Sequence, residues 1–270
     1  MSRSNASRVV FWVSLSLLSI VAASAILAPS IASHDPTDQR LESRFEKPGS
    51  PSHLLGTDSF GRDVFSRIVY GSRSALLVGL VSVSISLGIG LPLGLLAGIR
   101  GGRLDGAIML LMDAILSFPT VLLAITVVTM LGYGLLQVMV AIGVIFSPVF
   151  ARLVRAEALA ISREGYVESA RALGTPAMKA VLLHFLPNMA PKIIVQCAII
   201  FASSIVIESS LSYLGLGTQP PNPSWGLMLK DARNYLLHSP YLAVWPGLAI
   251  GITVLAFNLF ADAITEIIEP

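Results

Sequence analysis

The chain has 270 residues, of which 54% are hydrophobic and 13% charged, and its formal net charge is +2. Its mean hydropathy of +0.77 exceeds that of an ordinary globular domain and indicates a membrane protein. The small net charge, with its basic residues dispersed over short loops, argues against nucleic acid as a partner.

The first predicted element is an apolar segment from Val9 to Leu27, which follows Arg3 and Arg8. It is longer than the roughly 7 to 15 residues of the apolar part of a secretory signal. We therefore interpret it as a retained anchor helix.

Five further spans are predicted, because about 20 helical residues cross the hydrocarbon core of a bilayer. Residues 74–99 carry no charge, and neither do residues 114–151, which are too many for one helix and are divided by the sequence LGYG at 131–134. The predicted spans are residues 73–100, 104–130, 135–154, 192–214 and 241–259. The fold class is thus all-α, a polytopic membrane protein with six transmembrane helices.

The distribution of Lys and Arg predicts that both termini face the cytoplasm, since basic residues near span ends are retained on that side. Ten basic residues then lie inside: Arg3, Arg8, Arg100, Arg103, Arg152, Arg155, Arg163, Arg171, Lys179 and Lys192. The expected organisation is an N-terminal anchor with an extracytoplasmic segment (1–72), a transmembrane domain (73–262) with a large cytoplasmic loop (155–191), and a cytoplasmic tail (263–270).

The cytoplasmic loop has the pattern of two short helices. Ser162 is expected to cap the first helix, Gly174 to end it in a left-handed conformation, and Thr175-Pro176 to begin the second. An apolar stripe of Tyr166, Ala170 and Leu173 would face away from the charged side chains Arg163, Glu164, Glu168 and Arg171. Physical reasoning leaves two roles open for such a loop, lying along the lipid interface or docking into another protein.

The sequence ESA at 168–170, followed by Gly174 and by Pro187, resembles the cytoplasmic loop motif of permease subunits in bacterial ATP-binding-cassette (ABC) importers. Ser169 departs from that motif, in which alanine is usual. The resemblance implies that the loop inserts a short coupling helix into a groove of a cytoplasmic ATPase. The coupling residues it implies are Arg163, Glu164, Tyr166, Glu168, Ala170, Arg171, Leu173, Gly174 and Pro187.

Two further stretches, residues 54–79 and 208–229, resemble the second of the two permeases in dipeptide, oligopeptide and nickel importers. This resemblance implies a type I ABC importer permease in a bacterial cytoplasmic membrane, forming half of a translocation pore. It also implies three partners: a homologous second permease, two ATPase subunits or a fused ATPase, and an extracytoplasmic substrate-binding protein. ATP and Mg would be bound by the partners, with no cofactor in this chain and no enzymatic activity of its own. The implied substrates are di- or oligopeptides, with nickel as the alternative.

Three acidic residues lie in or at the ends of predicted spans, namely Asp113, Glu208 and Asp262. Acids inside a membrane either serve the transport route or are paired structurally. We favour a structural role for Asp113 and Asp262, which lie within reach of water or another helix, and a hydrogen-bonded bend at Glu208 over a place on the route.

The remaining polar residues suggest no chemistry. The four histidines, His34, His53, His184 and His238, have no paired spacing, and Cys197 is the one cysteine, so no metal site is expected. Small residues at Gly88, Gly90, Gly94 and Gly98 favour close helix packing, and Pro92 and Pro119 favour kinks.

Two other classes compete with an ABC permease. An intramembrane serine protease needs a nucleophile beside a base, and no G-x-S-x-G motif occurs. An ion-driven secondary transporter could use Asp113 and Glu208 as coupling carboxylates. None of the four lysines is followed by Ser or Thr, so the chain has no phosphate-binding loop.

Overall fold

The computed structural model describes residues 3–268, apart from the side chains of residues 3–6, 168, 171, 177 and 268. The described part is helical, with an isolated bridge between Thr57 and Asp63. The helices are α1 (Arg3–Ile26), α2 (Ala28–Ile31), η1 (Leu41–Ser43), α3 (Val64–Arg100), α4 (Gly102–Leu116), α5 (Thr120–Leu131), α6 (Leu135–Ile161), α7 (Gly165–Ala172), α8 (Ala177–Ala180), η2 (Val181–Phe185), α9 (Leu186–Tyr213), α10 (Trp225–Ala232), η3 (Arg233–Tyr235) and α11 (Tyr241–Ile268).

Within the described residues, five helices are long and apolar enough to cross a membrane, and a bent pair makes a sixth candidate. The bent pair replaces the predicted continuous span 104–130. Its two helices, α4 and α5, meet at an angle of 91°. The break lies at Pro119, whose backbone is extended (φ −57°, ψ 126°). Proline lacks the N–H that a helix interior needs and disfavours helical geometry in the preceding residue, so the helix ends before it.

Several helices extend further than the hydropathy pattern predicted. α3 begins at Val64, so the expected boundary at residue 73 lies inside a helix. α6 continues to Ile161, α9 begins at Leu186, and α11 runs to Ile268, through most of the expected tail 263–270. Hydropathy registers only the apolar part of a helix, whereas backbone hydrogen bonding continues into the polar ends.

The close packing of α3 against α6 depends on glycine. A Cβ atom added at Gly90 would lie 2.5 Å from the Ser147 carbonyl oxygen, and one added at Gly94 would lie 2.6 Å from the Ala151 carbonyl oxygen. Gly98 meets α6 in the same way, whereas Gly88 faces open space, so the packing prediction was wrong for Gly88. The two backbones therefore touch with almost no side-chain layer between them.

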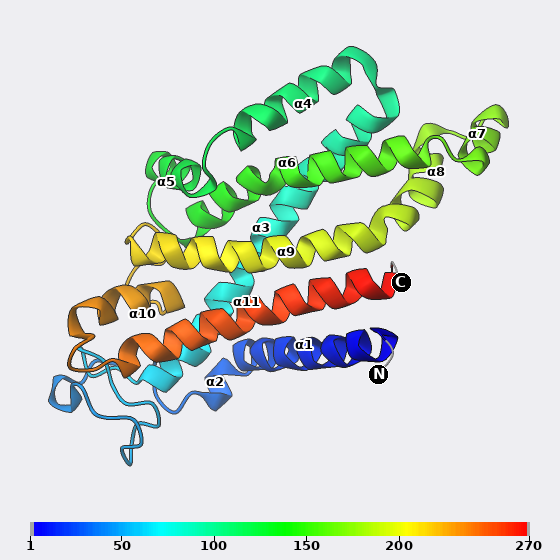
Figure 1. The fold of residues 1–270 in the computed structure, drawn as a ribbon. Coiled ribbons are helices and arrows are strands. Elements are labelled where there is room, and N and C mark those ends of the chain that lie inside the picture. The colour runs from blue at the N-terminus through cyan, green and yellow to red at the C-terminus, as the bar shows by residue number, and fades with distance from the viewer. Residues whose placement is uncertain (1–2, 269–270) are drawn as a thin grey trace.

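The two ends of the helix bundle are formed by different elements (Figure 1). Both chain termini and the α7–α8 loop lie at one end, and α10 with the segment between α2 and α3 lies at the other. α1 packs along α11, where the rings of Phe11 and Phe260 stack with centroids 5.6 Å apart. The hydroxyl of Ser7 donates to the Glu266 carboxylate near the termini.

Candidate functional site

The loop between α6 and α9 forms two short helices that meet at a tight turn. The turn is a left-handed C-terminal cap: Gly174 has φ +77°, and the Thr175 N–H donates to the Ala170 carbonyl oxygen at 3.0 Å. This hydrogen bond, from the residue after the glycine back to the last turn of the helix, is the Schellman arrangement. The expected turn at Gly174 is present.

The helix boundaries differ by a few residues from the predicted ones. Ser162 has helical geometry at the C-terminal end of α6 (φ −60°, ψ −20°), and α7 starts at Gly165 rather than directly after Ser162. The second helix begins at Ala177 and continues through η2 into α9. The start of the first short helix was predicted too early, because α6 continues past the apolar residues from which its end was predicted.

A π-helical turn, η2, immediately precedes Pro187. The Leu186 N–H donates to the Val181 carbonyl oxygen, five residues back. Pro187 has no N–H to offer the chain and its ring crowds the preceding turn, and the wider π geometry accommodates both within one helical run. Pro187 itself is exposed in the first turn of α9.

The loop between α6 and α9, residues 162–185, buries one face and exposes the other. Val167, Phe185 and Met189 are buried in a cluster with Val154 and Ala158 of α6. The opposite side presents apolar side chains to the surroundings, with Leu173 87% exposed and Met178 71% exposed, and with Leu182 and Leu183 also exposed. The loop therefore has a fixed base and an apolar outer surface.

Most of the predicted coupling residues whose burial is described are exposed. Tyr166 is exposed, accepts a hydrogen bond at 3.1 Å from the Asn188 amide and contacts the His184 ring. Arg163 and Glu164 are exposed and Ala170 is half-buried. Glu168 and Arg171 belong to α7, but their side chains lie outside the described residues.

Ion pairs attach the neighbouring helices to α6 beside this loop. Arg155 donates through two guanidinium nitrogens to both carboxylate oxygens of Asp105, with one distance of 2.6 Å, and joins α6 to α4. Lys192 of α9 binds Glu157 of α6 at 2.8 Å. These pairs brace the part of α6 that leads into the loop.

The other predicted acids lie in different surroundings. Asp113 pairs with Arg152 of α6 at 2.6 Å, and both side chains are more than half exposed. Asp262 is exposed on α11. Because they lie on different helices and Asp113 already has a cationic partner, the structure does not bring these acids together into one site.

Glu208, in contrast, is buried near the C-terminal end of α9. Its carboxylate accepts a hydrogen bond from the Ser212 hydroxyl at 2.6 Å and from the Thr218 hydroxyl at 3.2 Å. The Thr218 N–H donates to the Ser212 hydroxyl oxygen at 3.0 Å. Glu208 therefore fastens the chain that leaves α9 back onto the helix.

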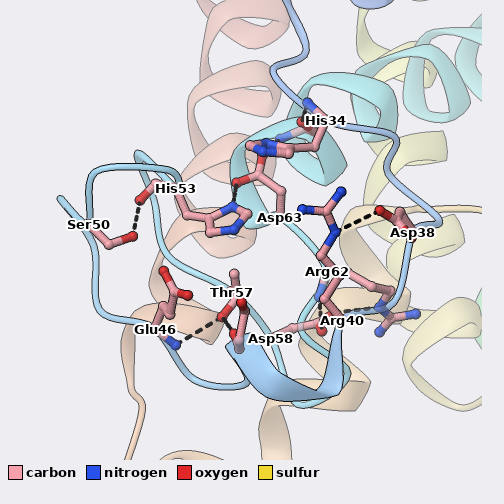
Figure 2. Close-up of polar contacts among 12 residues, drawn as sticks. His34, Asp38, Arg40, Glu46, Ser50, His53, Thr57, Asp58, Arg62 and Asp63 are labelled. Atoms are coloured by element: carbon pink, nitrogen blue, oxygen red, sulfur yellow. Dashed lines mark hydrogen bonds and ion pairs between the residues drawn. The ribbon is translucent and has the colours of Figure 1, made fainter.

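The segment between α2 and α3 forms a polar network that the sequence pattern did not predict (Figure 2). Asp58 accepts from the Arg62 guanidinium at 2.6 Å, and Arg62 also reaches Asp231 of α10 at 2.9 Å. Arg67, fully buried in the first turn of α3, donates to the Pro36 carbonyl oxygen at 2.9 Å. Residues 54–79 match a family motif, but the motif does not indicate which side chains elsewhere in the chain they contact.

A turn at the start of this segment orients the chain entering the network. Asp35 accepts hydrogen bonds from the hydroxyl and the N–H of Thr37 at 2.6 and 2.7 Å. These two donors, the hydroxyl first, lower the pKa of the exposed Asp35 carboxyl below its ordinary value. The turn leads the chain from His34 towards Pro36, which accepts from Arg67.

Comparison with known proteins gives consistent similarities. A sequence profile of the family described as "Binding-protein-dependent transport system inner membrane component" matches residues 90–270. The chain is 43% identical to a glutathione transport system permease protein, GsiD, of Pectobacterium atrosepticum, over 84% of this chain and 75% of that protein. It is 39% identical to a di/tripeptide transport system permease protein, DppC, of Pseudomonas aeruginosa, over 91% of this chain and 83% of that protein.

Among solved structures, the fold is similar to a chain of the MetNI methionine ABC transporter in an inward-facing conformation. The TM-score is 0.64 at 21% identity, over 76% of this chain and 97% of that chain. At this identity the likeness bears on the fold alone, and it matches the importer permease fold that the sequence predicted.

Proposed function

Because the chain belongs to the family of inner membrane components of binding-protein-dependent transport systems, we propose that it imports short peptides as one half of an ABC transporter pore. It is a multi-pass inner membrane permease of the peptide and glutathione group. It is not an enzyme in itself, since ATP hydrolysis belongs to partner subunits of such systems. Membership in this family replaces the ion-driven transporter and the intramembrane protease as interpretations.

The observation that carries the coupling role is the inner loop with its fixed base and apolar outer surface. Exposed Leu173 and Met178 flank the capped turn at Gly174, so the turn determines how α7 and α8 are presented together. An amphipathic helix that lays its apolar side into a groove uses anchors of this type. We assign to the loop the docking of a cytoplasmic ATPase, through Arg163, Glu164, Tyr166, Glu168, Ala170, Arg171, Leu173, Gly174 and Pro187.

Asp113 and Glu208 are proposed to stabilise the permease rather than line its route. Each already has partners that account for it: Asp113 has a guanidinium, and Glu208 has two hydroxyl donors. These partners engage one oxygen of each carboxylate, which favours a structural role over contact with a passing substrate.

The complete transporter is proposed to contain a second, homologous permease, two ATPase subunits or a fused ATPase, and an extracytoplasmic binding protein. The end of the bundle with both termini and the inner loop would face the cytoplasm (Figure 1). The residues 1–72, 73–262 and 263–270 would then serve as anchor with outer segment, transmembrane domain and inner tail.

Peptides of two or three residues are the proposed substrates. The supporting relatives are named for di/tripeptides and for glutathione, which is itself a tripeptide derivative. Nickel is the alternative cargo that the sequence resemblance left open.

Uptake into proteoliposomes tests the proposal. The transporter would be reconstituted with its partner permease, ATPases and binding protein, and labelled dipeptide, tripeptide, glutathione and Ni²⁺ supplied in turn with ATP inside. We expect ATP-dependent accumulation of a di- or tripeptide and not of Ni²⁺. Accumulation of Ni²⁺ alone, or of peptide without ATP, would contradict it.

A further inference from the structure

Three side chains that are distant in the sequence converge at the outer end of α3. His34 lies in the chain after α2, and His53 lies in the turn at residues 50–56. Asp63 is the residue that caps the N-terminus of α3. One ligand atom from each lies within 4.8 Å of the other two. Figure 2 shows the three side chains close together at this end of the helix.

Hydrogen bonds within the protein do not account for the close approach of the two imidazole rings, His34 and His53. Their centroids are 4.5 Å apart, with the planes tilted by 34°. His34 Nδ1 is shielded from solvent and has no hydrogen-bond partner among the described residues. A buried polar atom of this kind calls for a partner that the protein chain itself does not supply.

The Asp63 carboxylate beside them is paired with no arginine among the described ion pairs. Asp63 is 2% exposed, and its two oxygens meet His53 Nδ1 at 2.9 Å and the Ser66 N–H at 2.8 Å. The guanidiniums of Arg62 and Arg67, in the ion pairs of the described residues, face Asp58 or Asp231. A buried carboxylate that adjoins two imidazole rings and no arginine is a position suited to a cation.

We propose that His34, His53 and Asp63 bind a divalent transition-metal ion, with Zn²⁺ as the best match. Two imidazole nitrogens and a carboxylate oxygen are ligands that Zn²⁺ accepts, and water would complete a tetrahedron. Bonds of about 2.0 to 2.1 Å place tetrahedral ligand atoms roughly 3.3 Å apart. The side chains therefore have to close by about 1.5 Å at most, and the ion takes the place of the proton shared by His53 and Asp63.

Such an ion would act as a clamp on the outer segment. It would join the chain after α2, the turn around His53 and the N-cap residue of α3. These parts are otherwise held by hydrogen bonds such as that from the backbone N–H of His34 to Ser66 Oγ at 3.1 Å. No metal site is expected from the sequence here, because spacings of 19 and 10 residues between the ligands match no local motif.

Metal binding by the assembled transporter tests the proposal. The complex would be purified through a tag without histidine, treated with chelator and titrated with Zn²⁺ alone, and bound zinc counted by elemental analysis. We expect wild type to hold one ion more per complex than His34→Ala or His53→Ala. The affinity should fall about 100-fold or more, since even residues that only support ligands typically contribute 10- to 100-fold. His238→Ala, which changes an exposed histidine of the outer side, should bind as wild type does.

Limited trypsin digestion provides a second readout on wild-type protein. Arg40 and Arg44 are exposed in the segment that the ion would clamp. Zn²⁺ should slow cleavage after these residues in wild type and not in His34→Ala, a change at a half-buried position that leaves the His53–Asp63 hydrogen bond intact. Equal zinc binding by wild type and His34→Ala, or cleavage unaffected by Zn²⁺ in wild type, would overturn the proposal even if His53→Ala fails to assemble.

Discussion

Replacing Gly174 by valine isolates the role of the capped turn in the inner loop. The backbone at this residue has φ +77°, and a Cβ atom added there meets nothing within 4 Å. The penalty is therefore entirely conformational, about 1 to 2 kcal/mol for a residue with a Cβ in the left-handed region. This corresponds to a factor of about 5 to 30 against the native turn.

The expected result is loss of coupling without loss of the membrane-spanning helices. The spans owe their stability to apolar length and to packing elsewhere, so Gly174→Val should reach normal abundance in the membrane. Transport should fall, and the ATPases should copurify less or no longer respond to the loaded binding protein. Both quantities can be measured on the assembled complex, as ATP hydrolysis with and without binding protein and as ATPase content after purification.

Two matched variants separate the turn from general damage to the loop. Gly165→Val adds the same side chain at the start of α7, again with nothing within 4 Å and without a positive φ, and should couple normally. Gly174→Asn should retain most activity because asparagine tolerates the left-handed conformation. Wild-type transport and coupling in Gly174→Val would refute the reasoning and leave the loop as a helix on the lipid surface.

Three other outcomes follow from contacts described above. Gly94→Val places a Cβ atom 2.6 Å from a backbone oxygen of α6 and should destabilise the chain by about 1 to 3 kcal/mol. The measurement is the unfolding temperature in detergent, which should fall. The control Gly88→Val has open space around the added side chain and should unfold at the wild-type temperature. Glu208→Leu leaves the hydroxyl donors of Ser212 and Thr218 without their acceptor and should lower the free energy of unfolding by about 1 to 3 kcal/mol for each buried group. Glu208→Gln should lower it less, because the amide oxygen is still an acceptor. Equal unfolding temperatures for the two variants would contradict this reasoning. Ser52 and Ser169 are both exposed, so a cysteine at either position can be labelled in a cysteine-free background. Ser52→Cys should react with an impermeant thiol reagent from outside, and Ser169→Cys should react only in inverted vesicles. The reverse labelling pattern would contradict the proposed topology.

The hydropathy pattern predicted where the helices cross the membrane better than where they end. The apolar run 74–99 indicated a span, but the helix that contains it starts ten residues earlier at Val64, with the Ser66 N–H bound by Asp63. Nothing in an apolar count marks such a cap. The break at Pro119 was expected as a kink, and the 91° angle depends on what packs against α5, which sequence alone does not specify.

Local turn chemistry was predictable in the inner loop and long-range pairing was not. Gly174 before Thr175-Pro176 indicated a left-handed cap because few other residues adopt that conformation. The approach of His34 to His53 depends on how the segment between α2 and α3 folds back on itself. The approach of Arg62 to Asp231 depends on the packing of the start of α3 against α10. Each of these side chains on its own has an ordinary surface interpretation, so the sequence contained no signal for the pair.

The glycine contacts between α3 and α6 have a mechanical consequence. Helices separated by side chains can slide by exchanging rotamers, but backbone resting on backbone at Gly90, Gly94 and Gly98 leaves little that can yield. α6 leads directly into the inner loop. A displacement of that loop by the ATPase would therefore move α6 and α3 together as one rigid unit. The more compliant joint would lie at the bend beside Pro119, where the helical run is interrupted between α4 and α5.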